Sequence, residues 1–243
     1  MGDLVTIVIP FYNDPFVSNA IQSALSQTYP DVEIVVVNDG SSAHTELITP
    51  FLSRIRYITK PNGGTPSALN EGIRQAKGRY IAWLSSDDRF YPTKLERQIA
   101  FMQKNHARIS YTNFDRIDAA GRVTRQRAGR LFKSIIPFYE RFLKGNPVNG
   151  CTVVAEKDLL QELGLFDESL LYTHDNDLWL KVLLNRIKFY YLDESLTQYR
   201  MHSGMGTYRH KPAIRQEFAR MQARHLPLLK KVIRALKKEH GIR

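Results

Sequence analysis

Two adjacent carboxylates, Asp87 and Asp88, follow an apolar run of the kind that forms a buried strand. Ionised carboxylates this close repel each other, and keeping both charged costs free energy unless something neutralises them. A hard divalent cation does so, and Mg²⁺ typically takes one or two protein carboxylates together with substrate phosphate oxygens. The pair therefore indicates a Mg²⁺ or Mn²⁺ site for a phosphorylated ligand. A solvated turn or a helix cap is the alternative without a metal.

A second acidic pair, Asp175 and Asp177, lies directly before the apolar residues Leu178-Trp179-Leu180. Capping of a helix N-terminus accounts for one of these two carboxylates but not for both. We therefore expect one of them to have a functional role.

Polar residues follow all four predicted strands of the first half of the chain. Turn formation is the ordinary explanation of a single Asn, Asp or Gly after a strand. Ligands of open α/β sheets, however, bind outside the carboxyl ends of the strands, so four consecutive polar strand ends favour one shared site. No GxGxxG sequence is present, which disfavours a dinucleotide-binding fold, and no P-loop lysine motif is present either. The residues are Tyr12, Asn13 and Asp14, then Asp39 and Ser41, then Asn62 to Gly64, then Asp87 and Asp88.

The elements that must position these residues alternate between strand and helix. Near-continuous β-branched runs at 4–10 and 32–38 are typical of strands buried on both faces of a parallel sheet. This alternation with short links predicts an α/β fold with a doubly wound, mostly parallel sheet flanked by helices. The other expected elements are strands at 55–59 and 80–84, helices at 16–27 and 67–76, and a short helix before the third strand.

The second half of the chain has a less regular pattern. We expect a basic stretch at 122–130 to be mobile. The expected elements are helices at 95–104, 157–163 and 176–185 and strands at 109–114, 148–154 and 188–192.

Apolar residues make up 43% of the 243 residues, enough for a sizeable core in one α/β domain with an appendage. No apolar run approaches the roughly 18 residues of a membrane-spanning helix, and the N-terminus does not resemble a signal peptide. Cys151 is the single cysteine, so we expect no disulfide framework and no cysteine-based zinc site. We expect a cytoplasmic protein with Cys151 buried rather than nucleophilic.

The net charge of +11 is concentrated at the C-terminal end. Residues 207–243 carry 11 Lys and Arg against Glu217 and Glu239, whereas residues 1–206 carry 24 against 22. A nucleic-acid-binding domain needs its own basic face, and this near-neutral body has none, so no nucleic-acid partner is expected.

The basic tail has an amphipathic pattern. From Ala213 onward, apolar residues recur at three- and four-residue steps with basic residues between them, and we expect Pro227 to divide this stretch into two helices. The apolar stripe packs on the main domain in one interpretation. In the other, residues 213–243 bind an anionic membrane surface, which would suit a lipid-linked acceptor. The protein would then be peripheral on the cytoplasmic face of the membrane.

Seven motifs together resemble those of the family 2 glycosyltransferases, which have the GT-A fold. The resemblance covers roughly residues 4–205, and seven motifs in order and spacing make chance an inadequate explanation. The motifs are VTIVIPFYND, VEIVVVNDGSS, NGGTPSALNEGI, KGRYIAWLSSDD, GLFDESL, HDNDLWL and YRMHSG.

The resemblance implies a nucleotide site in the first half of the chain. Asp39 would accept a hydrogen bond from uracil or another base, and a uridine diphosphate donor is favoured over thymidine or guanosine diphosphate donors. Asp87 would lie nearer the ribose. The remaining implied nucleotide-binding residues are Pro10, Tyr12 and Asn13 around the nucleoside, and Gly63, Gly64 and Asn70 along the nucleotide.

The resemblance also implies the reacting groups. Asp88 would bind the divalent cation directly, and Asp175 would be the general base. Arg200 and His202 would belong to a loop that closes over the donor, where His202 contacts the metal or the diphosphate.

Taken together, these implications predict an inverting, metal-dependent transfer of a sugar from a nucleotide diphosphate-sugar to a hydroxyl of a glycan or lipid-linked acceptor, in glycan or polysaccharide biosynthesis. The catalytic domain would span 1–206, with a nucleotide-binding half at 1–90 and an acceptor-side half at 91–206, and the tail would span 207–243.

Two residues depart from the family pattern. Ser85 stands where an acidic residue often precedes the metal-binding Asp, and His174 replaces the usual Glu before the base.

Two alternative functions remain open. Because of His174, the protein could be a catalytically inactive protein that binds nucleotide sugars. A sugar nucleotidyltransferase is a second alternative, but the expected Gly-rich, basic loop after the first strand is missing. Gln198 does not begin a Gln-x-x-Arg-Trp sequence, so the chain does not match the processive polysaccharide synthases.

Overall fold

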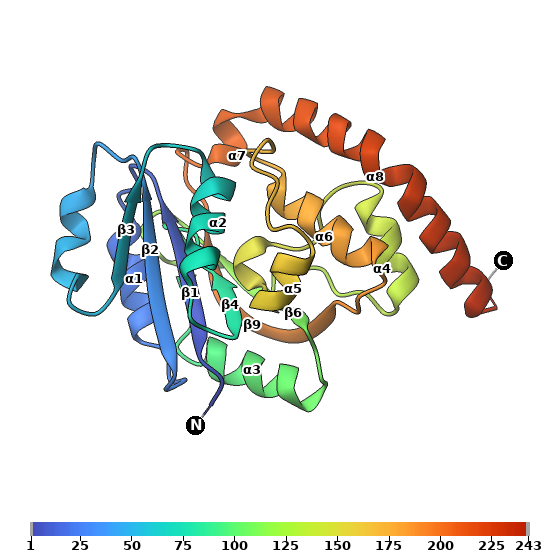
Figure 1. The fold of residues 1–243 in the computed structure, drawn as a ribbon, viewed down its shortest axis with the longest axis horizontal. Helices are drawn as coiled ribbons and strands as arrows, with labels where there is room; N and C mark the ends of the chain where they lie inside the picture. Colours follow the sequence, from blue (N-terminus) through green and yellow to red (C-terminus); the bar gives the residue numbers. More distant parts are fainter. Residues whose placement is uncertain (1, 242–243) are drawn as a thin grey trace.

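The computed structural model describes residues 2–241, and in that range nine strands form one mixed sheet flanked by helices (Figure 1). Its first four strands are parallel, in the order β3-β2-β1-β4. These strands are β1 (Val5–Phe11), β2 (Val32–Asp39), β3 (Arg56–Lys60) and β4 (Tyr80–Trp83). The predicted α/β fold is confirmed, and β1 and β2 are the buried strands that their β-branched runs predict.

The sheet is covered on both faces, because alternate residues of β1 point to opposite sides. Val5 and Ile7 pack in the same core cluster as α1 (Val17–Leu25), whereas Val8 packs with α2 (Thr65–Gln75). Where a short helix was predicted before β3, the chain forms two 3₁₀ turns, η1 (Thr45–Leu47) and η2 (Thr49–Phe51).

The second half of the sheet continues from β4 in the order β8-β6-β9-β5, with β7 paired to β6. Here β6 and β9 are parallel, and the other pairs are antiparallel. The strands are β5 (Arg89–Phe90), β6 (Ile109–Ile117), β7 (Val123–Arg125), β8 (Val154–Glu156) and β9 (Tyr190–Arg200). The helices of this half are α3 (Lys94–Lys104), α4 (Ile135–Phe142), α5 (Lys157–Glu162) and α6 (His174–Leu184).

One predicted strand, at 148–154, is wrong for most of its length. The chain forms a 3₁₀ turn, η3 (Gly150–Thr152), in which the Asn149 side chain accepts a hydrogen bond from the Cys151 amide. A Cβ atom on Gly150 would lie 2.0 Å from the ring of Trp83, so only glycine lets the backbone approach this ring. The alternation of residues in a strand pattern gives no sign of such a contact. The strand β8 begins only at Val154.

The C-terminal helix α8 (Lys211–Glu239) is continuous, so the prediction that Pro227 divides the tail into two helices is wrong. Pro227 is exposed, and its missing N–H removes only one hydrogen bond from the helix. The apolar residues on both sides of it pack in the same core cluster as α6, and burial of this stripe outweighs the local cost. These residues are Met221, Leu229, Ile233 and Leu236.

Helix α8 arches over α4 and α6 (Figure 1), and a short helix, α7 (Gly206–Arg209), joins it to β9. The predicted domain boundary at 206 falls at the start of α7, and residues 1 and 242–243 of the predicted domains lie outside the described residues. Among the described helices, none combines the length and apolarity needed to cross a membrane.

Candidate active site

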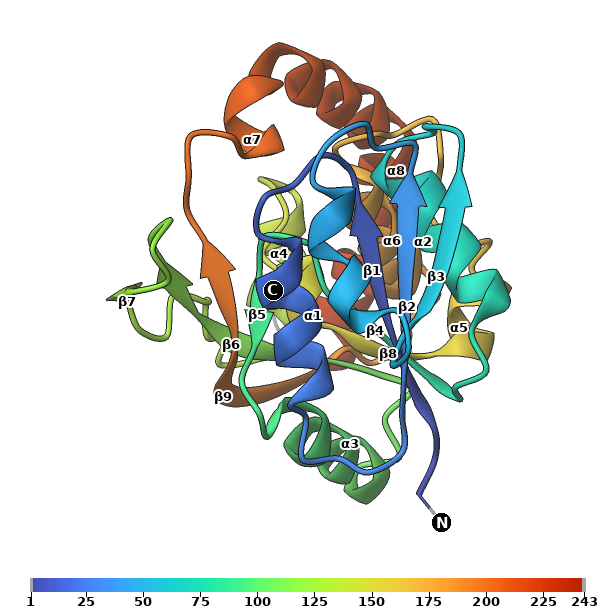
Figure 2. The ribbon, with the colours of Figure 1, turned by 90° about the vertical axis from the view of Figure 1, so that its left-hand side faces the viewer.

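The strands β1, β2 and β3 point to the same end of the molecule, where α7 also lies (Figure 2). Side chains that follow these strands therefore gather at one edge of the sheet, as ligand sites of open α/β sheets do.

Tyr12 and Asn13 shape the end of β1. Tyr12 is 54% exposed, so its ring is open to a planar ligand. Asn13 has a left-handed backbone (φ 49°), and its side-chain oxygen accepts hydrogen bonds from the amides of Ser42 and Ala43, both at 2.8 Å. These bonds join the loops after β1 and β2. Pro10 is buried within β1, so it does not line an open surface at this edge of the sheet.

Asp39 holds the Asn62-Gly63-Gly64 turn in place. Its Oδ1 accepts hydrogen bonds from Lys60 Nζ (2.7 Å) and the Gly63 amide (2.9 Å), and its Oδ2 accepts one from the Gly64 amide (2.7 Å). Gly64 has φ +85°, a conformation that favours glycine. Asp39 is 2% exposed, and its Oδ2 retains a lone pair for a further donor such as a base N–H.

Asn70 links α2 to the loop before α6. Its amide nitrogen donates to the Phe166 carbonyl and to Glu168 Oε1, both at 2.9 Å, and its oxygen accepts from the Phe166 amide at 3.0 Å. Both N–H groups of this buried side chain are therefore engaged within the protein. The structure gives Asn70 a role in holding the loop and directs no free polar atom of it toward a nucleotide.

Asp87 and Asp88 differ sharply in environment. Asp87 Oδ2 lies 3.1 Å from His202 Nε2, and the two side chains are 20% and 15% exposed. Asp88 is 1% exposed: its Oδ1 accepts a hydrogen bond from the Arg200 amide at 2.8 Å, and its Oδ2 has no partner. Burial, then the charge of Asp87, raises the pKa of Asp88 well above its usual value.

A third carboxylate, Asp14, lies at the same place. Its Oδ2 accepts a hydrogen bond from Ser86 Oγ at 3.0 Å. Burial raises the pKa of Asp14, and the charge of Asp87 adds to this effect. Three carboxyl groups thus gather at this place, and their mutual repulsion would be relieved by a bound cation.

Arg200 is the last residue of β9 and is 1% exposed, so it does not belong to an open loop over the donor. Its guanidinium donates to the carbonyl oxygens of Asp87 (2.7 Å), Asp118 (3.2 Å) and Ala119 (2.9 Å). Arg200 thus fixes the backbone beneath Asp87, while His202 follows β9 and faces the carboxylate. The contact of Arg200 with a diphosphate stays a prediction.

The candidate metal ligands would supply only part of the coordination shell of a cation. Among residues 2–241, no group of three His, Cys, Asp or Glu side chains converges closely enough to hold a metal. Asp87 and His202 offer two partly exposed donors, and a Mg²⁺ or Mn²⁺ ion takes its other ligands from water and substrate phosphate. Because Asp88 is buried, Asp87 is the better placed of the two carboxylates to face such an ion.

Asp175 is the second residue of α6 and is partly buried. Its Oδ2 accepts a hydrogen bond from Asn146 Nδ2, and its Oδ1 accepts one from the Asn176 amide, both at 2.7 Å. Burial raises the pKa of Asp175 to about 6, against the lowering effect of these hydrogen bonds. A carboxylate with this pKa is ionised at neutral pH and is a better proton acceptor than an ordinary aspartate, which suits a general base.

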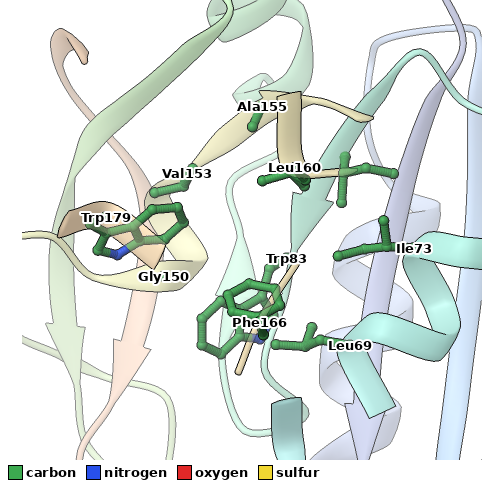
Figure 3. Close-up of a pocket in the computed structure, with 10 residues that line it drawn as sticks. Leu69, Ile73, Trp83, Gly150, Val153, Ala155, Leu160, Phe166 and Trp179 are labelled. Atoms are coloured by element: carbon green, nitrogen blue, oxygen red, sulfur yellow. The ribbon is translucent and has the colours of Figure 1, made fainter. Parts of the chain in front are cut away.

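His174 points away from solvent into an aromatic cluster. It is 5% exposed, and its ring centroid lies 5.5 Å from Trp83 and 5.4 Å from Phe166. Burial lowers its pKa to about 4, so it is neutral at physiological pH. The pocket behind Trp83 is lined by apolar side chains, which does not suit a diphosphate (Figure 3).

Three contact residues of this site were not singled out from the sequence. Lys60 pairs with Asp39, and its position as the last residue of β3 could have indicated it. Asn146 contacts Asp175 from a segment without a motif, and Glu217 contacts the loop before α6 from the tail. Neither Asn146 nor Glu217 lies in a sequence motif that could have indicated its contact.

Comparison with known proteins shows the family to which the chain belongs. Residues 6–160 match the family model for glycosyl transferase family 2. An uncharacterized glycosyltransferase of Rickettsia prowazekii (strain Madrid E) is 42% identical over 216 residues, which cover 84% of this chain and 66% of the relative. The Escherichia coli UDP-Glc:alpha-D-GlcNAc-diphosphoundecaprenol beta-1,3-glucosyltransferase WfgD is 34% identical over 184 residues, 74% of this chain and 70% of that protein.

Among solved structures, S. aureus TarS 1-349 in complex with UDP-GlcNAc matches with a TM-score of 0.73 at 19% identity, over 90% of this chain and 66% of that chain. At this identity the match shows a common fold. The chain spans 66% of the length of the Rickettsia prowazekii relative and 35% of that of a Rickettsia felis glycosyltransferase. Because the family model covers more than half of it, the chain belongs to glycosyl transferase family 2, with the GT-A fold.

Proposed function

We propose that the protein is an inverting, metal-dependent glycosyltransferase that moves a sugar from a UDP-sugar to a hydroxyl of a lipid-linked glycan. The observation that carries this proposal is Asp175, a partly buried carboxylate with a pKa raised to about 6 at the start of α6. The uridine donor and the lipid-linked acceptor are supported by the printed activity of the E. coli relative and by the UDP-GlcNAc complex of TarS.

The chain's own residues account for the main steps. Asp175 accepts the proton of the acceptor hydroxyl while the hydroxyl oxygen attacks the anomeric carbon. The bond from that carbon to the diphosphate oxygen breaks on the opposite side, its electron pair leaves with UDP, and the configuration inverts. Asn146 holds the Asp175 carboxylate in one orientation during this transfer.

The donor side is proposed to be held by the strand ends. The exposed ring of Tyr12 would stack on the base, and Asp39 Oδ2 would accept from a ring N–H. A divalent cation bound by Asp87, with His202 beside it, would neutralise the charge of the leaving diphosphate.

A lipid-linked acceptor also gives α8 a second role. Its apolar stripe is used in packing on the domain, so its outer face is left with basic side chains. Such a face attracts an anionic lipid surface, and each Lys or Arg near it contributes about 1 kcal/mol. The exposed basic residues of α8 are Lys211, Arg215, Arg220, Arg224, Lys230, Lys231, Arg234 and Lys238.

The proposed activity is tested by incubating the protein with UDP-glucose, Mn²⁺ and a lipid-linked N-acetylglucosamine diphosphate. UDP release with a product of inverted anomeric configuration, read by NMR, is the expected result. Release of pyrophosphate would instead indicate a nucleotidyltransferase. UDP-sugar binding without UDP release, across a panel of donors and acceptors, would indicate a catalytically inactive protein.

A further inference from the structure

Helix α8 buries two polar side chains, Glu217 and His225, each 5% exposed. They are eight residues apart, so they lie about two turns from each other on the same side of the helix. Both face the catalytic domain, where α8 passes over α6 (Figure 1). A buried charged or polar group requires partners, and each of these side chains has them in the region that carries Asp175.

Glu217 binds the loop that leads into α6. Its Oε1 accepts a hydrogen bond from the Leu171 amide at 3.0 Å. Its Oε2 accepts from the amides of Tyr172 (2.9 Å) and Thr173 (3.0 Å) and from Thr173 Oγ1 (3.1 Å). One carboxylate from a distant helix thus orders three consecutive backbone amides directly before α6. The N-cap residue of α6, Thr173, makes no side-chain capping hydrogen bond of its own.

His225 binds the first turn of α6 itself. Its Nε2 lies 2.6 Å from Asp177 Oδ1, and the other oxygen of Asp177 lies 2.9 Å from Lys181 Nζ. Asp177 is completely buried. This carboxylate therefore contacts a side chain of α8 on one side and Lys181 of its own helix on the other.

The two contacts of α8 lie on either side of Asp175 in the sequence. Glu217 fixes residues 171–173, and His225 fixes Asp177, so the backbone of Asp175 is held from both directions. No other acidic residue of the tail is buried within the described residues, since Glu239 is exposed near the end of α8. The tail therefore helps to hold the backbone that carries the candidate base, Asp175.

We propose that Glu217 is a positioning residue for sugar transfer: it orders the 171–173 loop and thereby sets the place of Asp175 relative to the acceptor hydroxyl. This inference rests on the proposed function, in which Asp175 is the base. Displacement of a reacting group by about 1 Å can lower a rate by roughly 100-fold, so the loss of these bonds is expected to reduce turnover rather than donor binding.

The test is Glu217→Gln, which keeps the size of the side chain but turns an amide NH₂ toward backbone N–H groups. We expect kcat to fall roughly tenfold or more, with the KM for the UDP-sugar within about twofold of the wild-type value. Hydrogen exchange of the amides at 171–176 should become faster, while exchange in β1 and β2 stays unchanged. Glu239→Gln, the same change at an exposed site on the same helix, is the matched control and should leave all three readouts unchanged.

Wild-type kcat in folded Glu217→Gln protein would overturn the proposal, and so would an equal loss of UDP-sugar binding with faster exchange throughout the sheet. If that variant does not fold, Glu217→Asp, which keeps the charge on a shorter side chain, is measured in the same way with the same criteria. Absence of transfer by the wild-type protein would count against the proposed function instead. The exchange experiment would then still show whether Glu217 orders the loop before α6.

Discussion

The proposed base, Asp175, should control the rate of transfer through its protonation state. Its carboxylate is held by Asn146 and by the Asn176 amide, and its pKa is raised to about 6 by burial. The base acts only when ionised, so kcat should fall as the pH decreases through about 6 and should level off above it. A pH–rate profile with saturating UDP-sugar measures this limb.

Replacement of the base separates catalysis from stability. Asp175→Asn should lower kcat by roughly 10²–10⁴-fold while UDP binding with Mn²⁺ is retained. Because the folded-state pKa is raised, the ionised carboxylate destabilises the fold above that pKa, so the neutral variant should have an equal or higher Tm at pH 7.5. Asp158→Asn, an exposed acid in the first turn of α5, should change neither property. Near-wild-type turnover in Asp175→Asn would remove Asp175 from the mechanism.

The two adjacent carboxylates should respond differently to substitution. Asp87→Asn should abolish the tightening of UDP binding by Mn²⁺, because Asp87 is the partly exposed donor beside His202. Asp88→Asn should keep this metal dependence, because Asp88 is buried against the Arg200 amide and its raised pKa means that burial disfavours its charge. Calorimetry of UDP with and without Mn²⁺ measures both variants. The reverse pattern would identify Asp88 as the ligand, as its sequence position suggested.

Sequence patterns predict candidate functional residues but not how exposed those residues are in the fold. Asp87 and Asp88 look alike in the chain, and the pairing of β5 with β9 decides which of them is covered. That pairing joins residues about a hundred positions apart, as Arg89 with Gln198, and it also buries Arg200. Local spacing carries no signal for such a contact. The same limit applies to Asn146 and Glu217, which reach the α6 region from segments without motifs.

At the scale of elements, helices and strands of the first half are predictable because each is continuous in sequence and buried on a repeating pattern. The second half is less so, since η3 depends on the approach of Gly150 to Trp83 and α8 depends on tertiary packing. In α8, an apolar stripe that continues across Pro227 was a stronger signal than the proline itself. Intrinsic helix preference is a weak prior when a whole face of the helix is buried.

Pro227→Ala tests the continuity of α8. Restoring the N–H in an already formed helix should raise the free energy of unfolding by about 1–3 kcal/mol and leave the helix content almost unchanged. Thermal unfolding and far-ultraviolet circular dichroism measure these two quantities. Leu228→Ala, at a neighbouring exposed position, should have little effect on either. A clear increase in helicity in Pro227→Ala would indicate that the tail is broken at Pro227 in solution.

At the scale of the whole molecule, charge is distributed so that one helix carries most of the excess. The body is near neutral, whereas the tail holds 11 basic residues against two acidic ones, and the structure turns most of these basic side chains outward from α8. The buried side of the same helix supports the loop before α6. An anionic surface that attracts α8 would therefore be brought near the element that carries Asp175.

The membrane proposal predicts binding to vesicles that contain anionic lipid at low salt, and weak or no binding to neutral vesicles. The variant Lys230→Gln, Lys231→Gln, Arg234→Gln removes three exposed charges from α8 and should weaken binding by about 3 kcal/mol, or more than 100-fold. Its matched control is Arg54→Gln, Lys77→Gln, Lys104→Gln, which removes three exposed charges elsewhere and should bind like the wild-type protein. Sedimentation with vesicles measures all three proteins, and added salt should reduce binding because it screens the charges. Equal weakening in both variants would assign the effect to net charge rather than to α8, and a wild-type protein that ignores anionic vesicles at low salt would refute the membrane role.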